Sequence, residues 1–330
     1  MMINIKHIIA TKMPAVVNAI NFYYDYRQYN KYNYGNKKNK SFSAFEGKIY
    51  RQAHIIEKGL SLSEPRLGFG YDKICVLFEY LDEYIEKGYS TNETVFLNAL
   101  NVIEKYLKFH KDKQFCNDKV KIVETKLKCY SEYIDNDYAC GIEKTTRRTI
   151  MNECNKDFES LVMSRHSIRQ FSSENITLEE IKRAVKLAIH APSQCNRQSV
   201  KVYCSCDKVK KEKLDKIING NTGFAKDVNN YLVITSNISS YTSAYERNQM
   251  YVDGSLFAML LMLSLHSYGI GSCALQHSET KEKNLQVKKL LSIPDNEVVV
   301  MYLAIGKYKE EFEYALSKRK SIDEVLIIEC

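Results

Sequence analysis

The sequence predicts an α+β fold preceded by a helical N-terminal extension. Two observations support this fold class. The first half of the chain shows apolar residues at helical spacing, whereas the second half mixes helical patterns with short stretches rich in β-branched residues. These helices and strands do not alternate strictly, which favours a layered α+β arrangement over repeated βαβ units. We therefore expect two domains, residues 1–150 and 156–330.

The extension is expected to consist mainly of helices. Apolar residues recur every three to four positions over 71–89 and 92–111, and a third helix is expected over 118–134. Residues 135–155 are polar and mixed in charge, so we interpret them as a linker.

The second domain is expected to hold a mixed sheet flanked by helices. Thr177 and Glu180 form a capping-box pattern at a helix start, and Pro192 ends that helix. The expected strands are 199–206, 231–236 and 297–306, and the expected helices are 156–163, 177–191, 207–219 and 245–267.

Composition indicates a soluble globular protein. Of the 330 residues, 45% are hydrophobic and 27% are charged. The ten cysteines have no regular spacing, which favours free thiols in a reducing compartment over a disulfide framework. The apolar run 256–263 is too short to cross a bilayer. We expect a cytoplasmic protein without a membrane span.

The net charge of +8 arises mainly in residues 1–60, which hold ten Lys or Arg and three Asp or Glu. Such a segment could bind nucleic acid or an anionic surface. We favour a solvated helix or tail, and we do not expect nucleic acid as a partner.

A short basic stretch, SRHSIRQF at 164–171, indicates an anion-binding segment. Arg165, Ser167 and Arg169 alternate, so an extended backbone would place them on one side, with His166 between them. Arginine binds phosphate through several hydrogen bonds at once.

Two further stretches indicate what the anion is attached to. APSQCNRQS at 191–199 offers Ser193, Asn196 and Gln198, whose hydroxyl and amide groups suit the edge of a heteroaromatic ring. Near the C-terminus, Arg319 and Lys320 add cations. Together these residues favour a nucleotide-like cofactor.

RHSIRQF, APSQCNRQS, YGIGSCALQ and KRKSIDEV occur in an order and spacing that resemble the FMN-dependent nitroreductase family. The resemblance covers about residues 156–330. It implies a nitroreductase-like sheet and FMN as cofactor. The FMN phosphate and ribityl chain would be held by Arg165, His166, Ser167, Arg169, Arg319 and Lys320; the ring would be lined by Pro192, Ser193, Asn196 and Gln198, with the backbone of Leu275 and Gln276 near its reactive edge.

The resemblance also implies an activity and an assembly. The enzyme would be a homodimer with FMN at the interface, transferring hydride or electrons from NAD(P)H to a small organic acceptor through flavin N5. The chain departs from the family pattern where Ser199 and Val200 replace the usual proline and aromatic residue, and where Ser321 replaces a proline. These departures affect the expected shape of the substrate pocket.

Two alternatives stay open. The protein could be a flavin-dependent dehydrogenase of a biosynthetic intermediate, such as a modified peptide or a saccharide precursor, which the extension would recognise. It could instead be a flavin-binding scaffold without turnover.

Residues 51–70 of the extension combine titratable side chains with a glycine-rich loop. We expect this stretch to act as a lid over the flavin, with His54 as the candidate for proton delivery and Glu57 orienting it. The competing interpretation is a helix end and a packed loop. No pattern indicates a metal site.

Overall fold

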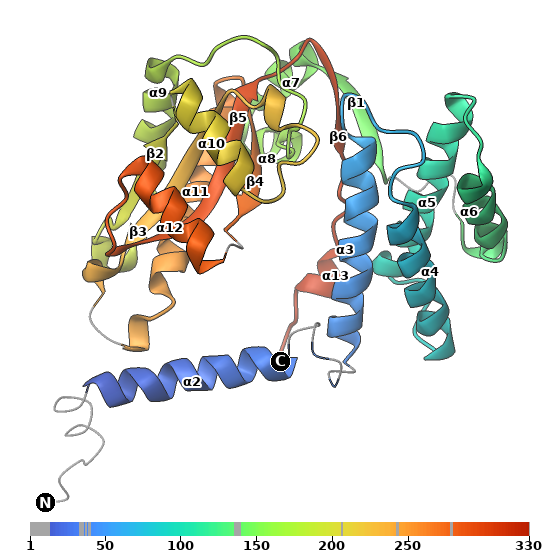
Figure 1. Cartoon of the computed structure of the whole chain (residues 1–330), viewed down its shortest axis with the longest axis horizontal. Helices are drawn as coiled ribbons and strands as arrows, with labels where there is room; N and C mark the ends of the chain where they lie inside the picture. The colour runs from blue at the N-terminus through green and yellow to red at the C-terminus, as the bar shows by residue number, and fades with distance from the viewer. Residues whose placement is uncertain are drawn as a thin grey trace, which may run out of the picture. The chain divides into compact units, whose positions relative to one another are not determined.

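The computed structural model describes residues 14–32, 36, 38, 41–134, 140–205, 207–241, 244–277 and 280–329. The chain forms two compact units (Figure 1). The sheet unit comprises the residues up to Tyr29 and Thr145–Phe312, and the helical unit comprises Asn30–Lys144 and Glu313–Cys330. The sequence predicted 1–150 and 156–330; the structure instead groups the terminal segment with the helices.

The helical unit contains the three helices that periodicity predicted, α4 (Tyr71–Glu86), α5 (Thr94–Asp112) and α6 (Asp118–Lys128), with the short η1 (Ser131–Tyr133) at the end of the third predicted range. It also contains α3 (Phe42–Leu60), which was not predicted. Their apolar faces, including Ile56, Leu77 and Val102, form one buried cluster. The terminal segment joins this unit through α13 (Ile322–Val325), where Glu324 accepts a hydrogen bond from the Thr94 hydroxyl at 2.9 Å.

The sheet unit is built on a four-stranded antiparallel sheet. Its order is β2 (Val200–Cys204), β3 (Asn230–Asn237), β5 (Glu297–Lys307) and β4 (Ile270–Gln276). Strands β2, β3 and β5 were predicted, whereas β4 was not. Because β3 and β5 are the inner strands, β2 and β4 form opposite edges of this sheet.

A separate two-stranded sheet pairs β1 (Ile142–Thr146) with β6 (Glu311–Ala315). The predicted linker 135–155 was therefore partly wrong, because β1 and α7 (Arg147–Cys154) occupy its described part. Thr146 ends the strand and also caps the helix, since its hydroxyl accepts from the N–H of Thr149 at 3.1 Å. Residues 135–139 lie outside the described part of the chain.

Helices cover both faces of the four-stranded sheet (Figure 1). On one face lie α9 (Leu178–Ala188) and α11 (Gln249–Ser267), and their apolar residues pack with Leu232 and Ile234 of β3. On the other lie α10 (Lys208–Ile217) and α12 (Lys281–Leu291); Tyr231 points there and donates to Asp215 of α10 at 2.8 Å. The remaining helices of the unit are α2 (Pro14–Tyr32), α8 (Phe158–Ser164), η2 (Gln194–Asn196), η3 (Ala225–Asp227), η4 (Ile238–Ser240) and η5 (Ala244–Glu246).

Helix α11 is the core helix of the sheet unit. By length and composition it could cross a membrane, but half of its most apolar window is buried inside the protein. At Gly254 it approaches β5 so closely that an added Cβ would lie 2.6 Å from a methyl carbon of Val300. The apolar character of α11 is therefore explained by packing on the sheet.

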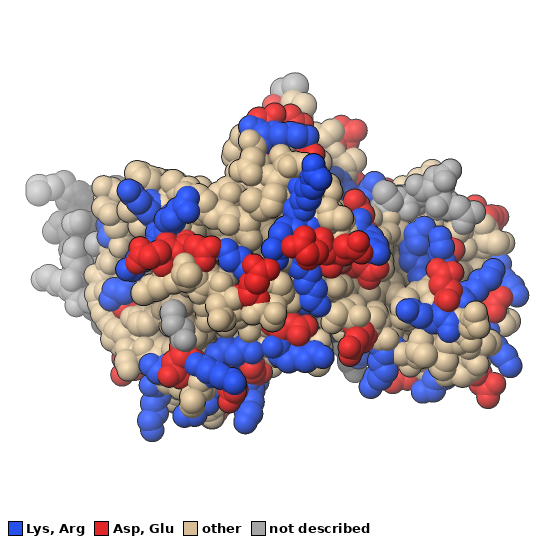
Figure 2. All heavy atoms as spheres, turned by 90° about the horizontal axis from the view of Figure 1, so that it is seen from above, with Lys and Arg blue, Asp and Glu red and all other residues tan. Residues whose placement is uncertain are grey.

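Charged residues of both signs are interspersed on the face that Figure 2 shows, without a broad basic area.

Candidate functional site

The candidate phosphate-binding segment, residues 165–169, lies beside the edge strand β4. Ser167 forms a parallel bridge with Ser272, and the N–H of Ile168 donates to the carbonyl oxygen of Ser272 at 2.9 Å. Ile168 is buried over Gly271, where an added Cβ would lie 3.2 Å from its side chain. The sheet therefore fixes the backbone of this segment.

Within it, Arg169 is a buried cation, with 6% of its surface exposed. Its Nη1 donates to the carbonyl oxygen of Ser167 at 3.4 Å, and its Nε has no hydrogen-bond partner among the described residues. A buried charge with an unsatisfied N–H is costly unless a ligand completes it. Arg169 therefore fits a site that receives an anionic group.

A chain of hydrogen bonds lies behind the segment. Oγ of Ser164 is 2.9 Å from Nε2 of His266, and Nδ1 of the same ring is 2.6 Å from the hydroxyl of Tyr308. Burial, with further unfavourable interactions from Arg165 and His166, lowers the pKa of His266 to about 4. The imidazole is therefore neutral at neutral pH and ties α11 to the start of the binding segment.

The second candidate stretch forms a loop around η2, directly before the other edge strand, β2. Cys195, Asn196 and Gln198 have φ of 49°, 53° and 48°, in the left-handed region. For residues with a side chain this conformation costs roughly 1–2 kcal/mol each. Asn196 and Gln198 are exposed, and Ser193 accepts a hydrogen bond from the Gln198 N–H at 3.0 Å. Pro192, Ser193 and Gln198 also line a cavity of about 150 Å³.

The end of β4 carries Leu275 and Gln276, opposite Tyr302 and Met301 of β5. Leu275 is buried and Gln276 is exposed, so the strand ends with a polar side chain at the surface. His277 follows, with Nδ1 2.8 Å from the Tyr302 hydroxyl.

Comparison with known proteins found a matching family and related sequences. Residues 162–236 and 219–307 match the model of the nitroreductase family. A protein of Archaeoglobus fulgidus is 29% identical over 164 residues, which cover 50% of this chain and 90% of that protein. MhqN of Bacillus subtilis is 27% identical over 203 residues, covering 51% of this chain and 97% of MhqN. Both relatives' names contain the words NAD(P)H nitroreductase.

Residues 162–307 belong to the nitroreductase family. Solved structures with nitroreductase in their descriptions are also similar to about half of this chain. A nitroreductase family protein of Streptococcus pneumoniae has a TM-score of 0.47 at 19% identity, covering 52% of this chain and all of that one. An FMN-dependent nitroreductase of Clostridium difficile has a TM-score of 0.41 at 23% identity, covering 50% of this chain and 92% of that one.

Within residues 162–307, the two sets of candidate residues lie apart from each other. The 165–169 segment flanks β4, whereas the 192–198 loop leads into β2, and these strands are the opposite edges of the sheet. Neighbouring strands lie about 4.8 Å apart, so the two edge strands are separated by about 14 Å across the sheet. The fold of one chain does not bring them together.

Two predicted phosphate ligands, Arg319 and Lys320, belong to the helical unit. There Nζ of Lys320 is 2.6 Å from a carboxylate oxygen of Glu46 and lies over the ring of Tyr50. Arg319 donates to the carbonyl oxygen of Ser317. Their assignment to the cofactor stays a prediction.

His54 also belongs to the helical unit, on α3. Its Nδ1 is 3.9 Å from Glu57, and Glu57 is buried and accepts the N–H of Gly141 at 3.2 Å. In the loop that follows α3, the N–H of Gly68 donates to Nε2 of His110 at 2.8 Å. These contacts give Glu57 and the loop structural roles within the unit, and the role of His54 as a proton donor stays a prediction.

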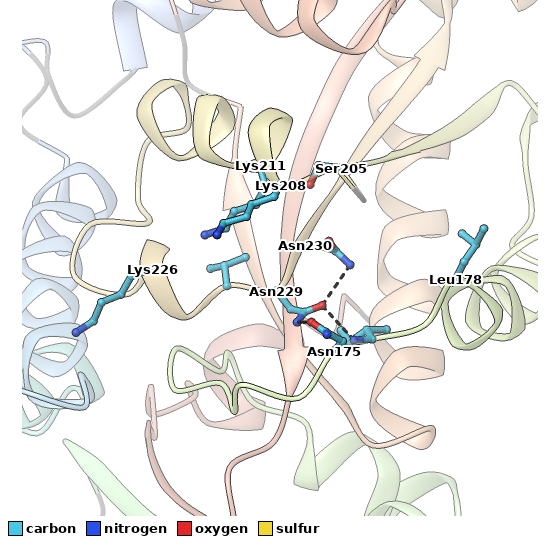
Figure 3. Close-up of a pocket in the computed structure, with 10 residues that line it drawn as sticks. Asn175, Leu178, Ser205, Lys208, Lys211, Lys226, Asn229 and Asn230 are labelled. Atoms are coloured by element: carbon cyan, nitrogen blue, oxygen red, sulfur yellow. Dashed lines mark hydrogen bonds between the residues drawn. The ribbon is translucent and has the colours of Figure 1, made fainter.

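A further pocket of about 550 Å³ lies between α10 and the segment before α9 (Figure 3). Lys208 and Lys211 point the same way along its wall, and Asn175 and Asn229 also line it. Lys211 donates to the carbonyl oxygen of Ala225 at 2.6 Å, so it ties α10 to the next turn. No trio of His, Cys, Asp or Glu with metal-binding geometry occurs in the described ranges.

Sequence reasoning missed Asp253, whose carboxylate is buried at the 192–198 loop. Both of its oxygens accept the N–H of Gln194, each at 3.2 Å. The available signal was that Asp253 is the only acidic residue in the apolar helix α11. Ser199, at the position where the family has proline, is buried and hydrogen-bonds Tyr241 at 2.6 Å.

The lowered pKa of His266 predicts an acid-sensitive contribution to stability. Below about pH 6.5 the unfolded chain binds a proton that the folded protein does not take up until about pH 4, so stability falls across this window. We expect His266 to account for a loss of about 3 kcal/mol by pH 4. The comparison is chemical unfolding of the wild type and His266→Gln at pH 7 and pH 4.5. The stability advantage of the wild type should narrow in acid; parallel pH profiles would contradict the assignment.

Proposed function

We propose that the protein is an FMN-dependent oxidoreductase that passes electrons from NAD(P)H to a small organic acceptor. The observation that supports this most strongly is Arg169, a buried guanidinium with an unsatisfied Nε inside the motif that the family resemblance assigns to the FMN phosphate. The fit of the neighbouring residues adds to it, since Arg165, His166 and Ser167 are half-buried and lie on the same fixed segment.

When bound, FMN would supply the redox chemistry, accepting hydride from NAD(P)H and reducing the acceptor. The chain's own residues would bind and orient it. Arg165, His166, Ser167 and Arg169 would hold the phosphate and ribityl groups; Pro192, Ser193, Asn196 and Gln198 would line the ring, and the backbone of Leu275 and Gln276 would lie near its reactive edge. No side chain is needed as a nucleophile.

We also propose that the working form is a homodimer. The two sets of candidate residues lie at opposite sheet edges of one chain, so a second copy could supply the loop that faces residues 165–169. Helix α11 supports such an interface, because Val252, Leu256 and Met259 form an exposed apolar row at helical spacing. We place this enzyme in the cytoplasm, where NAD(P)H is available.

The decisive experiment is the absorption spectrum of the purified protein, followed by NAD(P)H oxidation. We expect a flavin spectrum, release of FMN on denaturation, and turnover with a quinone or nitro compound. A colourless protein that does not take up added FMN contradicts the proposal. Bound FMN without NAD(P)H oxidation favours the scaffold alternative, and turnover only with a larger intermediate favours the biosynthetic dehydrogenase.

Removal of a phosphate ligand should weaken FMN binding without unfolding the protein. Arg165→Ala should cost roughly 1.5–3 kcal/mol of binding free energy, the value of a charge-assisted hydrogen bond. The matched control is Arg148→Ala, which removes an exposed arginine from α7 of the same unit. Arg319→Ala tests the terminal cations separately. Unchanged FMN affinity in both Arg165→Ala and Arg319→Ala would mean that the phosphate is held elsewhere.

A site shared between two chains predicts complementation. Arg165→Ala and Asn196→Gly alter opposite sheet edges, and glycine tolerates the positive φ of 53° at residue 196. Each variant alone should lose activity. When the two are co-expressed, about half of the dimers should be mixed and contain one intact site, which restores about a quarter of wild-type activity. Arg165→Ala with Ser167→Ala, which alter the same edge, should give no rescue. A monomer in solution, or mixed dimers without rescue, would exclude the shared site.

A further inference from the structure

The 192–198 loop needs an external support to keep its shape. Three of its residues, Cys195, Asn196 and Gln198, lie in the left-handed region that residues with side chains avoid. Within the loop the structure gives short-range bonds, such as the Asn196 N–H to the Ser193 carbonyl at 2.9 Å. A loop of this kind persists when surrounding groups over-determine its conformation.

Asp253 provides one such support from α11. It is 1% exposed, and its carboxylate accepts the N–H of Gln194, the amide of Gln249 at 2.8 Å and the hydroxyl of Tyr241 at 2.9 Å. These three hydrogen bonds satisfy the buried Asp253 carboxylate, and none of the three donors is a cation. The loop's entry is thereby bonded to the core helix.

Tyr241 provides the second support, at the loop's exit. Its hydroxyl lies 2.6 Å from Oγ of Ser199 and 3.2 Å from Oγ of Ser236, while it donates to Asp253. Burial, and secondarily the nearby Asp253 carboxylate, raises the pKa of Tyr241, so the phenol keeps its proton. One hydroxyl therefore connects both ends of the loop, Ser199 directly and Gln194 through Asp253.

The segment that carries Tyr241 is itself fastened to the loop. Arg197 forms a bidentate ion pair with Glu246 at 2.7 and 2.9 Å, and its Nη1 also donates to the carbonyl oxygen of Ser240 at 3.0 Å. The contacts of Arg197 therefore help to hold Tyr241 in position. The loop and the segment that carries Tyr241 stabilise each other.

We propose that Tyr241 and Asp253 are positioning residues that hold the 192–198 loop in the shape that presents Ser193, Asn196 and Gln198 to the cofactor. This inference rests on the proposed function. Tyr241 and Asp253 act through the loop, and neither is assigned a contact with the flavin.

The test is Tyr241→Phe, which removes one hydroxyl and keeps the ring. The matched control is Tyr203→Phe on β2, whose hydroxyl donates at 3.0 Å to another buried carboxylate, Glu297. The other partners of Glu297 are Lys201 and Thr235, which lie outside the 192–198 loop. FMN affinity is measured by quenching of flavin fluorescence, and amide hydrogen exchange over 191–199 is measured in the cofactor-free protein. Thermal unfolding of both variants reports general stability.

Because the lost bond goes to a charged group, we expect Tyr241→Phe to weaken FMN binding about tenfold or more and to speed exchange at residues 194 and 198. Tyr203→Phe should leave both measurements at the wild-type value even if it melts earlier. Asp253→Asn, which keeps the size of the side chain, should reproduce the effects of Tyr241→Phe.

Several results would overturn the inference. Tyr241→Phe could leave both readouts unchanged, or the control could change them equally, which would indicate general destabilisation. A loss of affinity without faster loop exchange would mean that Tyr241 acts on the cofactor directly. If the wild type binds no FMN, the proposed function fails, while the exchange measurement still decides whether Tyr241 holds the loop.

Discussion

The pairing of β5 with β3 on one side and β4 on the other determines where every candidate residue of the sheet unit lies. Eleven residues of β5 run the length of the sheet, and seven residues of β4 pair with it in continuous register. That register places Ser272 where it can bond to Ile168, and hence fixes the arginine-rich segment at the β4 edge. The same sheet order puts the 192–198 loop at the β2 edge, and this separation is the physical reason for proposing a shared site.

Three buried polar groups of this unit are satisfied in different ways, and the difference indicates their roles. Asp253 is surrounded by donors from the loop, Tyr241 and Gln249. His266 is bonded on both ring nitrogens and stays neutral. Arg169 keeps an Nε without a partner among the described residues. Complete satisfaction is typical of structural groups, whereas an incomplete buried cation is typical of a ligand site.

Local sequence patterns predicted the elements whose formation depends on local interactions. The capping box of Thr177 and Glu180 forms as expected, and the apolar spacing of α4 and α5 gave their bounds to within a few residues. The missed strands β1, β4 and β6 depend on partners far away in the chain. For the same reason, the sequence did not reveal that the terminal segment folds with the helices, where Glu324 bonds to Thr94, 230 residues away.

The candidate residues could also be predicted only where their chemistry is visible in a local sequence pattern. The motifs indicated Arg165, Arg169 and Asn196 because residue type and spacing carry that chemistry locally. Asp253 gave only the weak signal of a lone acid in an apolar helix, and its importance, like that of Tyr241, arises only when α11 and the segment after β3 meet the loop. A lone acid in an apolar helix can equally be a solvated surface residue, and only its burial in the fold distinguishes the two.

Ser199 stands where the family pattern has a proline, and these two residue types hold a backbone by different means. Proline fixes its own φ covalently and requires no partner. Serine leaves the backbone free, and here its hydroxyl bonds instead to Tyr241, 42 residues further along the chain. The loop conformation then depends on a hydrogen bond that a single hydroxyl deletion removes, and on the segment that carries Tyr241. A change in that segment can therefore alter the loop, and through it the proposed cofactor site, without touching any residue of the family motif.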